Sequence, residues 1–168
     1  MGLFNEIKKA VNEAAGFASF MGLAVGATDR LSVPGTNLSG LRVGVEKDDL
    51  FIGRFRGANL SGCDLTNCVL DRVDLTNADL SGAYLRGTKL RGALLINVDL
   101  QGACLIDVDL TGATLDMADL RGASLEGANL SYATLSGANL TGVSLRGTIL
   151  EGVVFDDVIG MNHLTGGD

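Results

Sequence analysis

The sequence is poor in the residues from which most catalytic and metal sites are built. Its 168 residues include one histidine, three cysteines, one proline and no tryptophan. The single imidazole, His163, lies near the C-terminus, away from any serine–aspartate or cysteine pattern that it could serve. An odd number of cysteines argues against a disulfide-stapled secreted domain. We therefore expect no enzymatic activity, no metal site and no cofactor.

Aromatic residues and positive charge are also scarce. Aromatics make up only 5% of the chain, whereas hydrophobic residues make up 46%, so the core must be aliphatic. The formal net charge of −7 argues against direct binding to nucleic acid, whose phosphates attract basic surfaces. The apolar content is ample for a core and argues against disorder.

The dominant feature of the sequence is a period of five residues. Counting from Leu50 to Phe155 in steps of five gives 22 consecutive positions, of which 20 are leucine and two are phenylalanine. Alanine stands two residues before this centre at 11 positions, and glycine stands two residues after it at 13. This period would wind the leucines around every face of a helix and alternate them across a strand. The chain must therefore turn once per repeat, with glycine, asparagine and aspartate at the turns.

These units resemble the pentapeptide-repeat family, whose motif is A(D/N)LXX. Examples are Ala58-Asn59-Leu60-Ser61-Gly62 and Ala118-Asp119-Leu120-Arg121-Gly122. The resemblance implies an all-β solenoid, a right-handed quadrilateral β-helix with four repeats in each 20-residue coil. At four per coil, 22 repeats give 5.5 coils, a rod about 26 Å long. Family resemblance also suggests a bacterial source.

The pattern divides the chain into four segments. Residues 1–30 are a hydrophobic, amphipathic segment, and residues 31–47 are a linker with degenerate first repeats. Residues 48–157 form the pentapeptide-repeat β-helix, and residues 158–168 form a C-terminal cap or tail. Two extra residues near Glu46-Lys47 break the register between the second and third segments.

The first segment predicts an N-terminal α-helix. Its apolar residues follow helical spacing, and from Ala14 to Ala27 the only polar residue is Ser19. Those 14 residues would span about 21 Å as a helix, which is too short to cross a bilayer. The candidate anchor or partner-binding residues of this helix are Leu3, Phe4, Ile7, Val11, Phe17, Phe20, Met21 and Leu23.

Four interpretations of this helix remain open from the sequence. It caps the first coil, lies on a membrane surface, packs into a larger assembly or homodimer, or is a cleaved export signal ending at Val25-Gly26-Ala27. A cap needs one apolar face, and the hydrophobicity of residues 14–27 exceeds that need. This excess favours a partner, so we expect a cytoplasmic protein, associated with a membrane or a larger complex through the helix.

Two outward features of the rod are candidate binding surfaces. Residues 20 apart stack on one face, which places Asp79, Asp99 and Asp119 in an acidic ladder. The ladder is either a mimic of duplex DNA, as in related proteins that protect DNA gyrase from quinolones, or a set of solvated consensus positions. Leu94, Ile96 and Met117 form an apolar patch where polar residues prevail, either a contact surface or scattered tolerated hydrophobes.

The apolar residues that follow the last repeats must cover the final coil. They are Val154, Phe155, Val158, Ile159 and Met161, and they serve either as a C-terminal cap or in end-to-end dimerisation. Taken together, the sequence predicts a non-catalytic scaffold or docking protein whose helix binds a membrane or a protein assembly. The alternative is a DNA-mimicking protein that acts on DNA gyrase.

Overall fold

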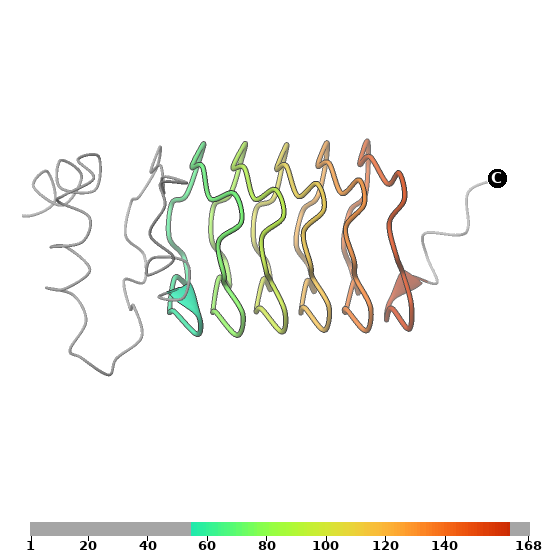
Figure 1. The fold of residues 1–168 in the computed structure, drawn as a ribbon, viewed down its shortest axis with the longest axis horizontal. Helices are drawn as coiled ribbons and strands as arrows, with labels where there is room; N and C mark the ends of the chain where they lie inside the picture. The colour runs from blue at the N-terminus through green and yellow to red at the C-terminus, as the bar shows by residue number, and fades with distance from the viewer. Residues whose placement is uncertain (1–54, 162–168) are drawn as a thin grey trace, which may run out of the picture.

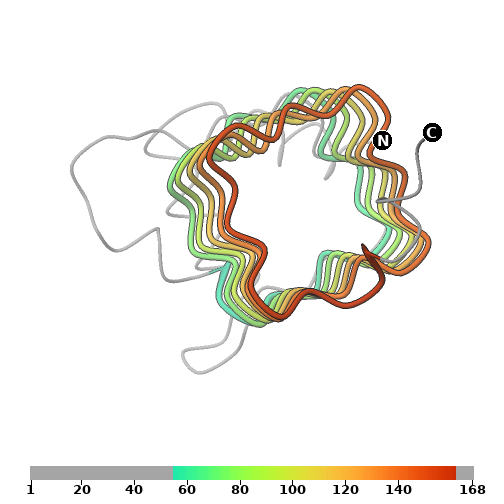
Figure 2. The same ribbon diagram turned by 90° about the vertical axis from the view of Figure 1, so that its right-hand side faces the viewer.

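The computed structural model of this chain describes residues 55–161. This part of the chain is a solenoid, and its coils stack one after another along the long axis of the molecule (Figure 1). Viewed along that axis, the coils superimpose in a four-cornered outline (Figure 2). The stacking follows directly from the sequence, because every coil repeats the same pattern of inward and outward residues.

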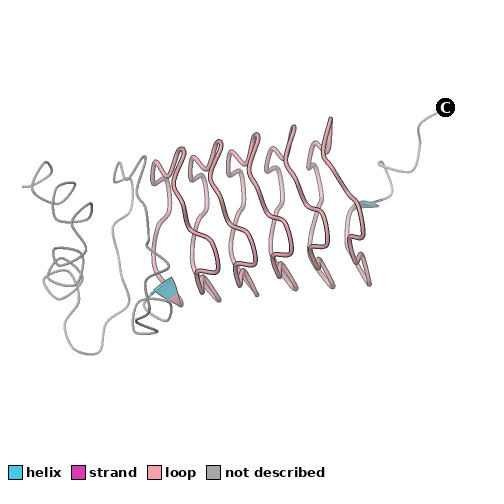
Figure 3. Ribbon diagram, turned by 45° about the horizontal axis from the view of Figure 1, so that its top comes forward, coloured by secondary structure: helices cyan, strands magenta, loops and turns pink. Residues whose placement is uncertain are grey.

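The coils are joined by single parallel bridges between residues 20 apart. The structure has 17 such bridges, from Asn59–Asp79 to Asn139–Ile159. Between residues 55 and 161 no bridge extends into a regular strand and no regular helix forms, so nearly all of this part is drawn as loop (Figure 3). The turn at every fifth residue explains this, because it leaves room for one bridge per repeat. The expected solenoid is confirmed, without continuous strands; the expected N-terminal helix lies outside the described residues.

Backbone hydrogen bonds run in both directions along the stack. The amide of Leu80 donates to the carbonyl oxygen of Asp99 in the next coil at 2.8 Å, and the amide of Asp99 donates back to Ala78 at 3.0 Å. Within each repeat a further bond closes the turn, as from the amide of Ala83 to the carbonyl of Leu80 at 3.0 Å. Each coil therefore satisfies the polar groups of its neighbours, as in other solenoids.

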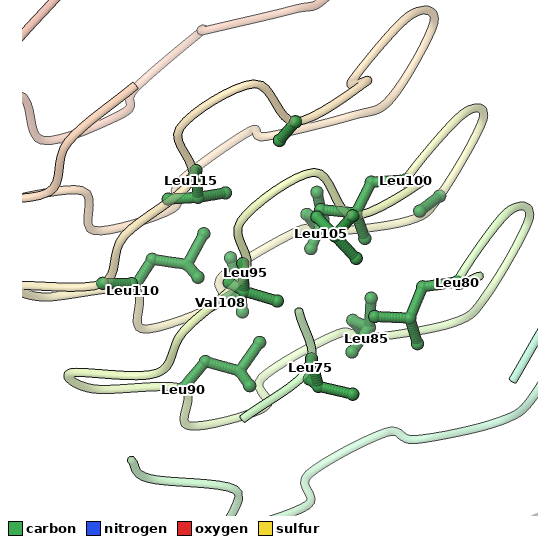
Figure 4. Close-up of a cluster of buried hydrophobic side chains, with 14 of the residues drawn as sticks. Leu75, Leu80, Leu85, Leu90, Leu95, Leu100, Leu105, Val108, Leu110 and Leu115 are labelled. Carbon is green, nitrogen blue, oxygen red and sulfur yellow. The ribbon is translucent and has the colours of Figure 1, made fainter. Parts of the chain in front are cut away.

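The interior is filled by the leucines of the five-residue period. At every fifth position from Leu75 to Leu140 the leucine is at most 1% exposed. Leucines 20 apart lie above one another in columns, for example Leu75, Leu95 and Leu115 (Figure 4). Each buried leucine contributes about 1.5–3 kcal/mol of transfer free energy. The small residues two positions earlier, mostly alanine, are also buried and leave room for these columns.

The corners require a left-handed backbone. Glycine has φ between 61° and 74° at thirteen corners, and asparagine or aspartate takes the same conformation at five others, such as Asn97 and Asp107. This bears out the expectation that these residue types make the turns. Arg72, Met117 and Tyr132 occupy the same position with φ near 60°, where a bulky side chain is disfavoured by about 1–2 kcal/mol.

Candidate functional site

Each face of the solenoid is built from one repeat of every coil, and two faces carry the candidate surfaces. We call one the acidic face; its central residues are Leu60, Leu80, Leu100, Leu120 and Leu140. We call the other the apolar face; its central residues are Phe55, Leu75, Leu95, Leu115, Leu135 and Phe155. On both faces the residues flanking each buried centre form the outer surface.

The acidic ladder lies on the acidic face as one continuous column. Parallel bridges join Asp79 to Asp99 and Asp99 to Asp119. Asn59 and Asn139 extend the column in the preceding and following coils. All five side chains are half-buried. The structure thus brings the three predicted aspartates together at the spacing of one coil.

Each ladder carboxylate caps a turn of its own repeat. The amides of Ser81, Gln101 and Arg121 donate to the Oδ1 atoms of Asp79, Asp99 and Asp119 at 2.9, 2.9 and 3.2 Å. The side-chain oxygens of Asn59 and Asn139 accept the same bond at 3.1 Å. Because asparagine performs this role equally well, the fold needs the oxygen at these positions and not the charge.

The charge of the ladder is partly neutralised at one end. Arg121 donates to Asp119 from Nε at 2.8 Å and from Nη2 at 2.6 Å. These hydrogen bonds hold the pKa of Asp119 below its ordinary value and raise the pKa of Arg121. Within residues 55–161, Asp79 and Asp99 have no basic side chain within 4.0 Å. Two of the three ladder aspartates therefore lie outside any ion pair, although the charge of Asp99 also acts on Arg121 and helps to raise its pKa.

The apolar patch of Leu94, Ile96 and Met117 lies on and beside the apolar face. Their side chains are 38%, 37% and 63% exposed. Leu94 and Ile96 flank the buried Leu95 in one coil, and Met117 follows at the corner of the next coil. Met117 has a left-handed backbone, and its sulfur lies over Gly137 of the following coil. The structure thus places the three predicted residues in neighbouring coils of one surface.

On the side of Leu94, the residues around the apolar patch are mostly polar and uncharged. Along the column that begins with Leu94, parallel bridges lead to Thr114, Thr134 and Val154. In the opposite direction Leu94 is bridged to Asp74, which is buried and 3.2 Å from Arg56. Among the described residues this column carries no charge beyond Asp74, as the column of Asp64 and Tyr84 carries none beyond Asp64, and the exposed Leu94 makes it a candidate protein-contact surface.

The family model for pentapeptide repeats, described as eight copies, matches residues 54–92, 78–116 and 118–157. The chain belongs to the pentapeptide repeat family. The match covers most of the described solenoid.

Solved structures of other pentapeptide repeat proteins are similar to this chain. One is a protein from the thylakoid lumen of Arabidopsis thaliana, with 35% identity, coverage of 67% of this chain and 75% of that one, and a TM-score of 0.51. A second, from Nostoc PCC 7120, has 33% identity, coverage of 58% and 84%, and a TM-score of 0.49.

A third similar structure is QnrB1, a plasmid-mediated fluoroquinolone resistance protein. It has 19% identity, coverage of 77% of this chain and 72% of that one, and a TM-score of 0.29. No curated protein matches this sequence.

The candidate C-terminal residues continue the pentapeptide repeat rather than forming a separate element. Parallel bridges join Val154 to Thr134 and Ile159 to Asn139, and both apolar side chains are exposed. Phe155, Val158 and Met161 are half-buried and pack against the leucine core. The five residues therefore separate into an inward set and an outward set.

The sequence reasoning missed two exposed tyrosines. Tyr132 has φ of 59° at a corner, and its hydroxyl donates to Glu151 at 2.6 Å, which raises the pKa of Tyr132. Tyr84 stands outward on the face centred on Leu65, Leu85 and Leu105, which follows the acidic face in each coil, and is bridged to Cys104. The sequence marks Tyr132 by placing a bulky residue where most repeats have the corner glycine. For Tyr84 the sequence shows only that the position faces outward.

The remaining candidates concern the N-terminus and metal binding. Leu3, Phe4, Ile7, Val11, Phe17, Phe20, Met21 and Leu23 all lie outside the described residues, as do segments 1–30 and 31–47. Cys63 and Cys68 are buried at small-residue positions. Within residues 55–161 no cluster of three histidine, cysteine or acidic side chains is suited to hold a metal ion. The same residues include no helix with the length and hydropathy of a membrane span.

Proposed function

We propose that this pentapeptide repeat protein is a non-catalytic docking or scaffold protein. Its solenoid presents outward side chains at fixed intervals, and residues 1–30 bind a membrane or a larger protein assembly in the cytoplasm. The observation that carries the proposal is the apolar patch. Leu94, Ile96 and Met117 are exposed on a regular, hydrogen-bonded face where polar residues or glycine fill most of the comparable positions of other coils.

The backbone geometry adds support to a role for the patch. Met117 adopts a left-handed conformation that glycine occupies at most corners of the rod. A strained position that persists in a regular repeat suggests that the side chain serves a purpose other than folding. A thioether is also well suited to a protein contact, because its flexible chain adapts to the shape of a partner.

Site-specific photocrosslinking tests the patch in the full-length protein. A photoreactive phenylalanine analogue at Met117 is expected to give discrete high-mass crosslinks in the cells that make the protein. The same analogue at Tyr84, which is 57% exposed on another face, is the control. The proposal fails if Met117 gives no crosslinks or gives only those seen at Tyr84.

Fractionation tests the N-terminal part of the proposal separately. Full-length protein is expected in membranes or in a large complex, and a chain that starts at Thr28 is expected in neither. Equal behaviour of the two chains as one small species would remove the anchoring role of residues 1–30. The crosslinking result at Met117 would be unaffected by that outcome.

A second candidate function, DNA mimicry toward DNA gyrase, is supported by Asp79 and Asp99. Parallel bridging stacks these two carboxylates, and among the described residues neither has a basic side chain within 4.0 Å. The test is gyrase supercoiling with excess protein, with and without a quinolone. The Asp79→Asn/Asp99→Asn variant keeps the turn bonds and removes the charge, so it is expected to lose any effect. Unchanged supercoiling by the original protein would eliminate this function.

A further inference from the structure

One face of the solenoid carries no net charge. We call it the balanced face, and its central residues are Leu70, Leu90, Leu110, Leu130 and Leu150. Its outward charges, at the positions just before, just after and two after each centre, are Asp71, Arg72, Lys89, Arg91, Asp109 and Glu151. Counted in the same way within the described solenoid, each of the other three faces is net negative. The balanced face therefore repels an acidic molecule less than the other faces do, and a second copy of this chain is such a molecule.

The charges of the balanced face are separated along its length. Its first two coils carry a net charge of +2, and its last three carry −2. In the basic half, Arg72 and Lys89 have no carboxylate within 4.0 Å among the described residues. The acidic half contains Asp109, which lies 3.9 Å from the Nε atom of Arg91, and Glu151. A face with one basic and one acidic half is complementary to a reversed copy of itself.

A cation and an aromatic ring stand at one edge of the balanced face. The corner that this face shares with the apolar face carries Arg72 and Tyr132, with Gly92 and Gly112 between them. Arg72 and Tyr132 have φ of 61° and 59°, a conformation that disfavours bulky side chains. A Cβ atom on Gly112 would have no atom within 4 Å, and one on Gly92 would meet only Arg72, at 3.7 Å. The corner between the cation and the ring is therefore bare of other side chains.

A twofold axis perpendicular to the rod relates the two halves of the balanced face. We place this axis between the coils of Leu90 and Leu110, so that it exchanges those two coils between a pair of antiparallel copies. Lys89 of each copy then faces Asp109 of the other, because both residues belong to the column directly before the centres. The axis therefore creates two contacts between opposite charges.

The same axis matches the corner residues. Every column repeats at the same offset of 20 residues, so the exchange of coils applies to the corner as well. Arg72 of each copy faces the ring of Tyr132 of the other, which is the arrangement of a cation–π contact. Gly92 faces Gly112, where two bare stretches of corner allow the backbones to approach.

Neighbouring positions of the axis bring like charges together. An axis through the coil of Lys89 and Arg91 would place each of these residues opposite its own copy. An axis one half-step further along, through the coil of Asp109, would oppose the two Asp109 side chains and would oppose Asp71 to Glu151. The charges thus select one register of the two copies.

We propose that two copies of this protein associate side by side and antiparallel along the balanced face and the corner of Arg72 and Tyr132. The contact is isologous and closes at a dimer. It covers few coils, so the dimer is weaker than one with a standard interface. Met117 lies at the opposite corner of the apolar face and stays accessible. The dimer is therefore independent of the proposed docking function.

Sedimentation equilibrium of the full-length protein measures the association. A salt concentration of about 0.15 M is suitable, because its screening length of about 8 Å weakens the repulsion between two net charges of −7 more than it weakens close contacts. The original protein is expected to form dimers reversibly as its concentration rises to the millimolar range.

Charge reversal tests the register. Lys89→Glu and Asp109→Lys are each expected to weaken the dimer about tenfold, because each variant alone brings like charges together twice. An equimolar mixture of the two variants is expected to regain the affinity of the original protein, because both contacts between the unlike chains are again between opposite charges. Arg146→Glu makes the same change of charge as Lys89→Glu on another face, and it is the control.

A second variant avoids any loss of folding at Asp109, whose side chain accepts the amide of Thr111. Arg72→Gly places glycine in a left-handed corner, so this chain is expected to fold and yet to dimerise more weakly. Asn97→Gly makes the same kind of change at the other corner of the apolar face and is expected to leave the dimer unchanged.

Four results would overturn the inference. The protein could remain a monomer at millimolar concentration, or form a dimer that Lys89→Glu does not weaken. The mixture of the two charge variants could associate no better than either variant alone, or Arg146→Glu could weaken the dimer as much as Lys89→Glu does. Crosslinks from Met117 to another protein would persist in each case, so the proposed docking function would stand without the dimer.

Discussion

At the scale of the residue, the corners show how one coil constrains the next. Asp107 has a left-handed backbone, and its side-chain oxygen occupies the space where a Cβ atom on Gly127 would lie, 2.5 Å away. Asn67 stands in the same relation to Gly87. At most corners a side chain is therefore followed by glycine at the corner 20 residues later. The exception is the column of Asn77, Asn97 and Met117, in which Asn97 donates a 2.8 Å amide hydrogen bond to Asn77.

This relation predicts different effects of one substitution at two glycines. Gly102→Ala is expected to lower the free energy of unfolding by about 1 kcal/mol, because φ is 64° and no atom lies within 4 Å of the new Cβ. Gly127→Ala, with φ of 68°, is expected to lower it further, because Asp107 must move. Urea unfolding measures both. In an Asp107→Gly background the two substitutions should become equivalent, and a persistent difference would refute the relation.

At the scale of the element, adjacent coils are also joined by an ion pair. Arg91 Nη2 lies 2.6 Å from Asp71 Oδ2 in the preceding coil, and Arg91 Nε lies 3.9 Å from Asp109 in the following coil. The hydrogen bonds from Arg91 hold the pKa of Asp71 below its ordinary value of 3.8. The Asp71 side chain is largely buried while Arg91 is half exposed, so solvent screening weakens the pair.

The pair predicts a pH-dependent contribution to stability. Because the pKa of Asp71 is lower in the folded chain, the contribution is present above pH 3.8 and is lost as the pH falls through the lowered value. Arg91→Gln is expected to reduce the free energy of unfolding at pH 6 and to have a much smaller effect near pH 2. Arg146→Gln, which removes a charge without an ion pair in the described solenoid, is the control. Equal pH profiles for the two variants would contradict the assignment.

The coil was the part of the structure most accessible to prediction from sequence. The inward leucines, the small residues before them and the corner glycines follow from the five-residue period, because only one chain path buries every leucine. The same period placed Asp79, Asp99 and Asp119 in one column. The hydrogen bond from Tyr132 to Glu151 was not predicted, because it depends on the directions of two side chains. Nor was the overlap of Met117 with Gly137, which depends on side-chain direction.

At the scale of the whole molecule, the parallel bridges make stability a property of neighbouring coils. Each coil contacts only the coils before and after it, and the same 20-residue offset holds for all 17 bridges. Loss of one complete coil should therefore leave the remaining contacts intact. Loss of part of a repeat is expected to disrupt those contacts, because every later leucine would move out of its column.

Two deletions test this statement. Removing residues 101–120 joins Leu100 to Arg121 in the original register and is expected to give a folded, shorter rod. Removing residues 101–118 shifts the register by two residues and is expected to prevent cooperative unfolding. Circular dichroism during heating and small-angle scattering measure the two outcomes. Similar unfolding of both chains would show that the register of the leucine columns does not determine the fold.

Because all of the bridges share one offset, the number of coils sets the length of the rod. Every added or lost set of 20 residues changes the separation of the two ends of the rod by one step of about 4.8 Å, while the outline in cross-section is kept. Side chains that project from different coils of the described solenoid are thus held at set distances from one another along the rod. Coil number is then a quantity that selection can adjust in whole steps, independently of the chemistry at either end.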